Sequence, residues 1–237
     1  MPALDGIAYT VTGSGPALVV PQCNVDWSRV DLTPLVNRFR VVVVAPCGFA
    51  PSTRPGGYTG AGMVADVERV LDHLDIDRYV SFGYSMNGAM ATLLGIDNPR
   101  VRAVVCGGFP TTGDLSGMAD RTRRMTDRAR LVKSNWDELV GRYDPEAAVA
   151  LYEAIGVLVP LIDRLDCPVW SWWGSEDERL EELGGIERHR RGLEDRGLRF
   201  EVLAGLDHLG ALDRIDLALP GALRWLEGQA SDGSMTP

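Results

Sequence analysis

A serine flanked by glycines is the feature of the sequence that most clearly suggests chemistry. The run Ser81-Phe-Gly-Tyr-Ser-Met-Asn-Gly88 places Ser85 between an apolar segment of strand type and an apolar segment of helix type. A serine hydroxyl is a poor nucleophile until a base removes its proton. A sharp strand-to-helix turn exposes the hydroxyl above the sheet and directs the next backbone N–H toward a developing oxyanion. The run therefore predicts nucleophilic catalysis by Ser85, with an ordinary turn serine as the alternative.

The elements that could position this serine alternate along the chain. Short apolar runs and helical patterns follow one another, which predicts βαβ units and a mostly parallel sheet. Four consecutive valines within 40–45 are typical of a strand covered on both faces. The expected strands are 6–12, 17–20, 40–45, 79–82, 101–106, 168–173 and 199–203. The expected helices are 27–39, 59–74, 89–96, 217–226 and one within 179–193.

The segment 109–166 departs from this alternation, because its pattern is mainly helical and is interrupted by Pro160. We predict an α/β core formed by 1–108 and 167–230, a helical lid inserted as 109–166, and a flexible tail at 231–237. Eight apolar or aromatic residues of the lid are candidates to line a pocket, although packing is the commoner explanation at helical spacing. They are Met118, Met125, Trp136, Tyr143, Leu151, Tyr152, Ile155 and Leu158.

Length and charge exclude several classes of protein. A chain of 237 residues fits one domain. The net charge of −9 argues against a nucleic-acid partner, and the basic stretch 121–133 is interleaved with acidic residues. The sequence contains neither a signal-peptide pattern nor the roughly 18 consecutive apolar residues that a membrane span needs. We therefore expect a cytoplasmic protein without membrane or nucleic-acid partners.

The cysteines and histidines do not form a metal site in this sequence. Cys23, Cys47, Cys106 and Cys167 are scattered without C-x-x-C spacing, so a disulfide framework is not expected. There is no H-E-x-x-H motif and no Cys/His cluster at ligand spacing. We predict an enzyme without a metal or an organic cofactor.

The run around Ser85 resembles the G-x-S-x-G nucleophile elbow of the α/β-hydrolase superfamily. Here it reads Gly83-Tyr-Ser-Met-Asn87, with Asn87 where the last glycine usually stands and Gly88 after it. The loop 48–55 resembles the family's G-F-G-x-S-x-x-P segment. The resemblance covers nearly the whole chain. It implies the α/β-hydrolase fold, with a mostly parallel central sheet flanked by helices and a short helical lid.

The resemblance also assigns partners to Ser85, since the family order is serine, then acid, then histidine. Gly174-Ser-Glu-Asp177 follows the expected strand 168–173 and resembles the family's G-x-x-D turn. Gly205-Leu-Asp-His-Leu-Gly210 resembles the family's G-x-x-H-x-G loop. His208 is thereby implied as the general base and Asp177 as the acid that orients it. Glu176 is the nearest rival for the acid, one residue off the motif.

Other residues that could do chemistry have simpler explanations. His73 lies in an amphipathic helical pattern and His189 in a charged run, so both are predicted to be solvated. Strand alternation would place Trp170 and Trp172 on one face and Trp173 on the other. Core packing is the simplest role for these tryptophans.

The oxyanion site is where this chain departs most from the family. The resemblance implies that the backbone N–H groups of Met86 and Cys23 hold the oxyanion. Family members usually have His-Gly where this chain has Pro21-Gln22, and glycine permits closer backbone approach than glutamine. The side chains at 22–24 could assist the oxyanion, narrow the pocket, or indicate chemistry other than ester hydrolysis. The candidate substrate-binding residues are Gln22, Asn24 and Tyr84.

The leading hypothesis is hydrolysis of an ester, thioester or lactone of a small, largely apolar molecule through an acyl-enzyme. Serine at position 85 argues against the dehalogenase and epoxide-hydrolase branches, which resemble this chain but use aspartate there. One alternative is a non-hydrolytic enzyme on the same scaffold, such as a cyclase, an acyltransferase or a C–C bond hydrolase. Another is a ligand-binding protein that retains the pocket. A short lid implies an open pocket, which a homodimer partner could cover.

Overall fold

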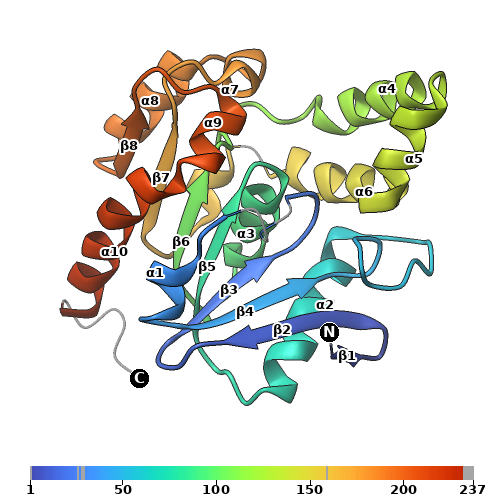
Figure 1. The fold of residues 1–237 in the computed structure, drawn as a ribbon. Helices are drawn as coiled ribbons and strands as arrows, with labels where there is room; N and C mark the ends of the chain where they lie inside the picture. Colours follow the sequence, from blue (N-terminus) through green and yellow to red (C-terminus); the bar gives the residue numbers. More distant parts are fainter. Residues whose placement is uncertain (1, 26, 28–29, 159, 232–237) are drawn as a thin grey trace.

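The computed structural model describes residues 2–25, 27, 30–158 and 160–231 (Figure 1). Among them, eight strands form one sheet in the order β1-β2-β4-β3-β5-β6-β7-β8. The pairs β1–β2 and β2–β4 are antiparallel, and all the other pairs are parallel. The strands are β1 (Ala3–Leu4), β2 (Ile7–Thr12), β3 (Ala17–Pro21), β4 (Arg40–Ala45), β5 (Tyr79–Tyr84), β6 (Val101–Gly107), β7 (Val169–Gly174) and β8 (Arg199–Leu203). The predicted mostly parallel sheet is confirmed.

Helices cover both faces of the sheet. The helices of the described residues are α1 (Thr33–Val36), α2 (Gly60–His73), α3 (Met86–Gly95), α4 (Met118–Arg130), α5 (Lys133–Arg142), α6 (Pro145–Gly156), the 3-10 helix η2 (Leu161–Arg164), α7 (Glu178–Glu182), α8 (Ile186–Glu194), α9 (His208–Asp213) and α10 (Ile215–Ser231). Apolar residues of α2, α3 and α6 join the core on one face, and those of α1, α9 and α10 join the core on the other. The chain therefore has the three-layer architecture expected of its α/β pattern.

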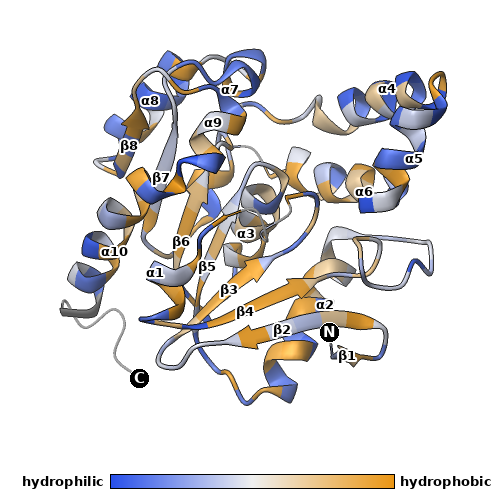
Figure 2. Cartoon of the chain, in the orientation of Figure 1, coloured by the Kyte–Doolittle hydropathy of each residue, from blue (hydrophilic) through white to orange (hydrophobic). Residues whose placement is uncertain are grey.

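Strand residues alternate between the two cores. Val19 and Val104 pack with α2 and α3, whereas their neighbours Val20 and Val105 pack with α1 and α10. Because both faces are covered, the central strands are nearly continuous in hydrophobic residues (Figure 2). The tryptophans follow the predicted alternation, since Trp170 and Trp172 lie in the α10-side core and Trp173 packs with Leu180 and Leu193.

Two predicted helical regions differ from the structure. In the described part of 27–39 the only α-helix is the four-residue α1, which has Pro34 in its first turn. Proline is favourable there but would disrupt the interior of a helix that started at 27. The helix expected within 179–193 is split into α7 and α8 by Gly184 and Gly185, which have φ values of +123° and +94°. Backbone in that region does not continue a right-handed helix.

The segment 109–166 contains α4, α5, α6 and η2. In Figure 1, α4 and α5 lie to one side of the sheet, and α6 leads back toward it. Ala147, Leu151 and Ile155 of α6 are buried in the same core as α2 and α3. Part of the predicted lid is therefore a packing helix of the main core. The division into 1–108, 109–166 and 167–230 stays a prediction, and the predicted tail lies outside the described residues from 232 onward.

Candidate active site

Ser85 lies in a strained turn between β5 and α3. Its φ of 56° and ψ of −124° are unusual for a residue other than glycine. The Ser85 N–H donates to the Gly107 carbonyl at 2.8 Å, which ties the turn to β6. A Cβ on Gly83 would lie 2.2 Å from the Asn87 carbonyl oxygen, so the close turn requires glycine there. The helix begins at Met86, earlier than the predicted start at 89.

The structure brings Asp177 and His208 to this serine from two different turns. His208 Nε2 lies 3.0 Å from Ser85 Oγ, and His208 Nδ1 lies 2.9 Å from both carboxylate oxygens of Asp177. Asp177 is completely buried and His208 is 6% exposed. Because a carboxylate only accepts hydrogen bonds, Nδ1 carries the hydrogen and Nε2 presents its lone pair to Ser85. This arrangement can remove the serine proton.

Asp177 and His208 are both positioned at the start of a helix. Asp177 precedes α7, and its Oδ1 accepts from the N–H groups of Arg179 and Leu180 at 3.0 Å each. His208 is the first residue of α9, and its carbonyl accepts a 2.7 Å hydrogen bond from Tyr84 Oη. Glu176, the rival acid, is exposed and makes no hydrogen bond to the ring. The carboxylate beside the imidazole ring is therefore that of Asp177 and not that of Glu176.

Asn87 makes contacts that its place in the motif did not predict. Its Oδ1 accepts from the backbone N–H groups of Cys23, Asn24 and Val25 at 2.9, 3.1 and 3.4 Å. Since all three partners are donors, the atom facing them must be the amide oxygen. The departure from glycine thus ties the loop after β3 to the start of α3, and the Cys23 N–H is occupied by this bond.

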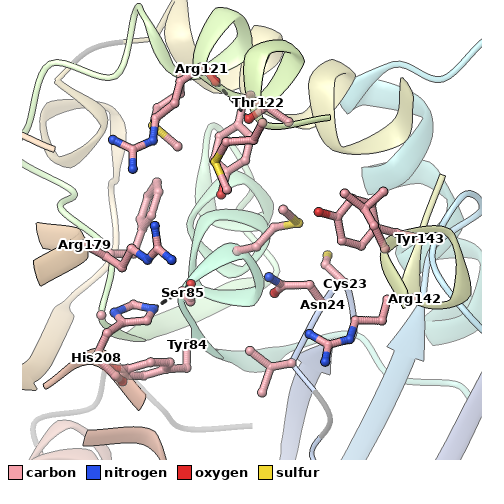
Figure 3. A pocket seen from close by; sticks show the side chains of 18 of the residues that line it. Cys23, Asn24, Tyr84, Ser85, Arg121, Thr122, Arg142, Tyr143, Arg179 and His208 are labelled. Carbon is pink, nitrogen blue, oxygen red and sulfur yellow. Dashed lines mark hydrogen bonds between the residues drawn. The ribbon is translucent and has the colours of Figure 1, made fainter. Parts of the chain in front are cut away.

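A cavity of about 720 Å³ opens above Ser85 and His208 (Figure 3). The predicted residues Gln22, Cys23, Asn24, Tyr84 and Met86 all contribute to its lining. Of the lid candidates, Met118, Met125, Tyr143 and Tyr152 line it, whereas Trp136, Leu151, Ile155 and Leu158 do not. Gln22 donates to the Ala50 carbonyl at 3.2 Å, and Tyr84 is fully buried with its hydroxyl committed to His208.

Three arginines that were not among the predicted site residues also line the cavity. Arg121 contacts Glu182, Arg179 lies 3.7 Å from Glu178 and 3.6 Å from Glu182, and Arg142 lies 2.7 Å from Glu138. The three positive charges are therefore balanced by three nearby carboxylates. Arg179 was detectable in principle, because it follows the predicted acid by two residues at a helix start.

Cys23, His189 and His73 are the other side chains whose reactivity or exposure was considered from the sequence. Burial raises the pKa of the Cys23 thiol, which keeps it protonated and unsuited to compete with Ser85 as a nucleophile. His189 is only 2% exposed, so its predicted solvation was wrong. Its ring packs on Trp173 at 4.9 Å and its Nδ1 bonds to Thr112 Oγ1 at 2.8 Å. The charged residues around His189 do not indicate that its side chain is the one buried against the core. His73 is exposed, as predicted.

Within the described part of the chain, no group of three or more His, Cys, Asp or Glu side chains is placed to bind a metal ion. No helix of these residues has both the length and the apolar character needed to cross a bilayer.

Sequence comparison finds similarity to α/β hydrolases over part of the chain. Residues 16–130 match the family model described as alpha/beta hydrolase fold. The chain is 34% identical over 109 residues to haloalkane dehalogenase 2 of Mycobacterium tuberculosis, and equally to that of Mycobacterium bovis. The match covers 43% of this chain and 37% of the relative, so it spans little more than a third of the relatives' length.

Structure comparison extends the similarity to the whole fold. A thermophilic esterase from Thermogutta terrifontis, with malate bound, superposes with a TM-score of 0.72 at 19% identity, over 94% of this chain and 93% of that one. The enol-lactonase from Burkholderia xenovorans superposes with a TM-score of 0.67 at 21% identity, over 93% and 96% of the two chains. With the sheet order, the elbow and the family model matched by residues 16–130, these similarities show that the chain has the α/β-hydrolase fold.

Proposed function

We propose that the protein hydrolyses an ester, thioester or lactone of a small, largely apolar molecule, with Ser85 as the nucleophile. The observation that carries this proposal is the hydrogen-bonded chain from Asp177 through His208 to Ser85 Oγ beside the cavity. A buried acid, an oriented imidazole and a hydroxyl at 3.0 Å are the groups that acyl transfer requires.

The steps follow from which atoms hold protons. His208 Nε2 takes the Ser85 proton while Oγ bonds to the substrate carbonyl carbon, and the carbonyl electron pair moves onto oxygen. The Met86 N–H, at the first position of α3 where no intrahelical acceptor exists, donates to that oxyanion. Collapse breaks the bond to the leaving alcohol or thiol, which departs with the proton from His208. A water molecule then attacks the acyl carbon while His208 Nε2 accepts its proton. The bond to Ser85 Oγ breaks, Oγ regains the proton from His208, and the acid is released.

The lining of the cavity favours an apolar acyl or leaving group. Met118, Met125 and Tyr152 extend from the lid helices, and Phe109 follows β6. The arginines add little net positive charge because carboxylates balance them. The structural similarity to an esterase and an enol-lactonase is consistent with carboxylic ester or lactone substrates.

Three alternatives to this hydrolase differ in what they require of Ser85. The curated relatives are haloalkane dehalogenases, but the branch that resembles this chain uses an aspartate nucleophile, and Ser85 has no carboxylate to offer. A non-hydrolytic enzyme on the same scaffold would use the same serine and histidine with a different acceptor. A binding protein would not need a hydroxyl aligned with an imidazole at 3.0 Å.

Covalent labelling by a fluorophosphonate probe, read by intact mass, tests the proposal most directly. We expect one adduct per chain in the wild type and none in Ser85→Ala or His208→Ala. The matched controls are Ser14→Ala and His73→Ala, which remove an exposed serine and an exposed histidine away from the cavity and should label normally. Failure of the folded wild type to label with probes of several sizes would refute the proposal.

Turnover distinguishes the hydrolase from its rivals. We expect hydrolysis of p-nitrophenyl acetate and butyrate that is lost in Ser85→Ala, with a kcat/KM that changes with acyl length. A protein that labels but transfers the acyl group to an added alcohol or amine faster than to water would instead be an acyltransferase.

A further inference from the structure

An oxyanion needs two donors, and of the two backbone N–H groups expected to supply them, those of Met86 and Cys23, only that of Met86 has no hydrogen-bond acceptor among the described residues. Met86 supplies the first, at the start of α3. The backbone candidate for the second is Cys23, but its N–H is directed to Asn87 Oδ1 at 2.9 Å. That same oxygen also accepts from Asn24 and Val25, so the loop is held with its N–H groups turned toward Asn87. A single N–H bonded in this way is not aimed at a substrate oxygen.

The side chain of Asn24 is differently placed. Its backbone N–H belongs to the Asn87 contact, but its carboxamide makes no hydrogen bond within the described residues, and its Oδ1 is buried without a partner. The residue lines the cavity together with Ser85 and Met86. In Figure 3 the carboxamide extends toward Ser85 from the side opposite His208. This is the side on which the carbonyl oxygen of an attacked substrate must lie when His208 receives the serine proton.

We propose that the carboxamide of Asn24, through its Nδ2–H, is the second oxyanion donor, in place of the Cys23 backbone N–H. Asn87 is then the positioning residue that fixes the loop so that Asn24 faces Ser85. A side-chain amide can perform this task because it offers two N–H groups and acquires no charge. The inference rests on the proposed hydrolysis, since it assigns a group to the same transition state.

The test measures hydrolysis of p-nitrophenyl acetate and the rate constant of fluorophosphonate inactivation for Asn24→Ala and Asn24→Asp. Loss of one oxyanion donor typically lowers kcat by about 10²–10³. We expect that loss in Asn24→Ala, with KM within about threefold of the wild type and inactivation slowed in proportion. Asn24→Asp keeps the shape but replaces the donor with a negative charge, so we expect a loss at least as large. Asn37→Ala, the same change at an exposed position outside the cavity, should leave both rates unchanged.

The kinetic signature separates this role from a structural or ground-state one. Asn24→Ala with an unchanged kcat would overturn the inference, whether or not KM rises, and would return the role to the Cys23 N–H. If thermal unfolding shows that Asn24→Ala is not folded, the near-isosteric Asn24→Asp provides the same test. A wild type that labels and turns over while both variants match it contradicts only this inference. A wild type that neither labels nor turns over contradicts the proposed function, and this inference with it.

Discussion

Replacement of Asp177 by asparagine tests how the carboxylate controls the proton on His208. In the structure Asp177 Oδ1 accepts from the backbone N–H groups of Arg179 and Leu180, while both oxygens face His208 Nδ1 at 2.9 Å. Asparagine has nearly the same shape. Its oxygen can keep the two backbone bonds, and its NH₂ group then stands where Oδ2 faced the imidazole.

The consequence for catalysis is large, and the consequence for stability is small. An NH₂ group opposite Nδ1 favours the tautomer with the hydrogen on Nε2, which then cannot accept the Ser85 proton. The same tautomer error in serine proteases lowers kcat by about 10⁴, equivalent to about 5 kcal/mol in the activation barrier. Because both bonds to the start of α7 persist, we expect the free energy of unfolding to change by only about 1 kcal/mol. Asp177→Ala loses these bonds and should unfold more easily.

The assay is the rate of fluorophosphonate inactivation and of p-nitrophenyl acetate hydrolysis, with urea unfolding in parallel. Glu176→Gln makes the same chemical change on the neighbouring exposed carboxylate and should leave both rates unaltered. If folded Asp177→Asn reacts at a rate within tenfold of the wild-type rate, the carboxylate does not set the tautomer of His208.

Three further changes have defined outcomes. In Gly83→Ala the new Cβ would lie 2.2 Å from the Asn87 carbonyl oxygen, so we expect activity to be lost and unfolding by urea to require about 3 kcal/mol less. Tyr84→Phe removes the 2.7 Å hydrogen bond to the His208 carbonyl and should lower the free energy of unfolding by about 1–3 kcal/mol, with kcat falling more than KM. Burial lowers the pKa of His189 from 6.5 to about 4. Between these values the unfolded chain binds a proton that the folded protein does not, so stability should fall by about 3 kcal/mol as pH decreases from 7 to 4.

Each of these expectations has its own control. Gly228→Ala adds a methyl group at a glycine of α10 that has open space around it and a φ outside the left-handed region, and it should not abolish activity as Gly83→Ala does. If Tyr84→Phe changes neither kcat, nor KM, nor the free energy of unfolding, the hydroxyl does not position His208. His189→Gln removes the titrating group. Between pH 7 and 4 its free energy of unfolding should therefore fall by about 3 kcal/mol less than that of the wild type. An identical pH dependence in this variant and the wild type would assign the loss to other groups.

Structural features that leave a local pattern in the sequence were predicted correctly, and features that leave none were not. The four valines of β4 were recognisable because a strand covered on both faces must be apolar along its length. Helix α2 was recognisable because its apolar residues recur at helical spacing after Thr59, whose side chain accepts from the Gly62 N–H. The apolar spacing over 27–39 predicts a helix, but Pro34 restricts the α-helix to the four residues of α1, because proline does not fit the interior of a longer one. The burial of His189 could not be read from charged neighbours, since one inward-facing residue among outward-facing ones leaves no local pattern.

Local patterns in the sequence were enough to predict the α/β architecture, the elbow at Ser85 and the order of its partners. These predictions depend on local periodicity, on glycines that a close turn requires, and on short motifs at strand ends. The contacts of the folded chain were needed to show that Asp177, and not Glu176, lies beside His208, and that Asn87 is bonded to the loop that holds Cys23 and Asn24. Those contacts join residues that lie 31 and 64 positions apart in the chain. The direction of a side chain across such a separation is set by the packing of whole strands and helices, which no local pattern encodes.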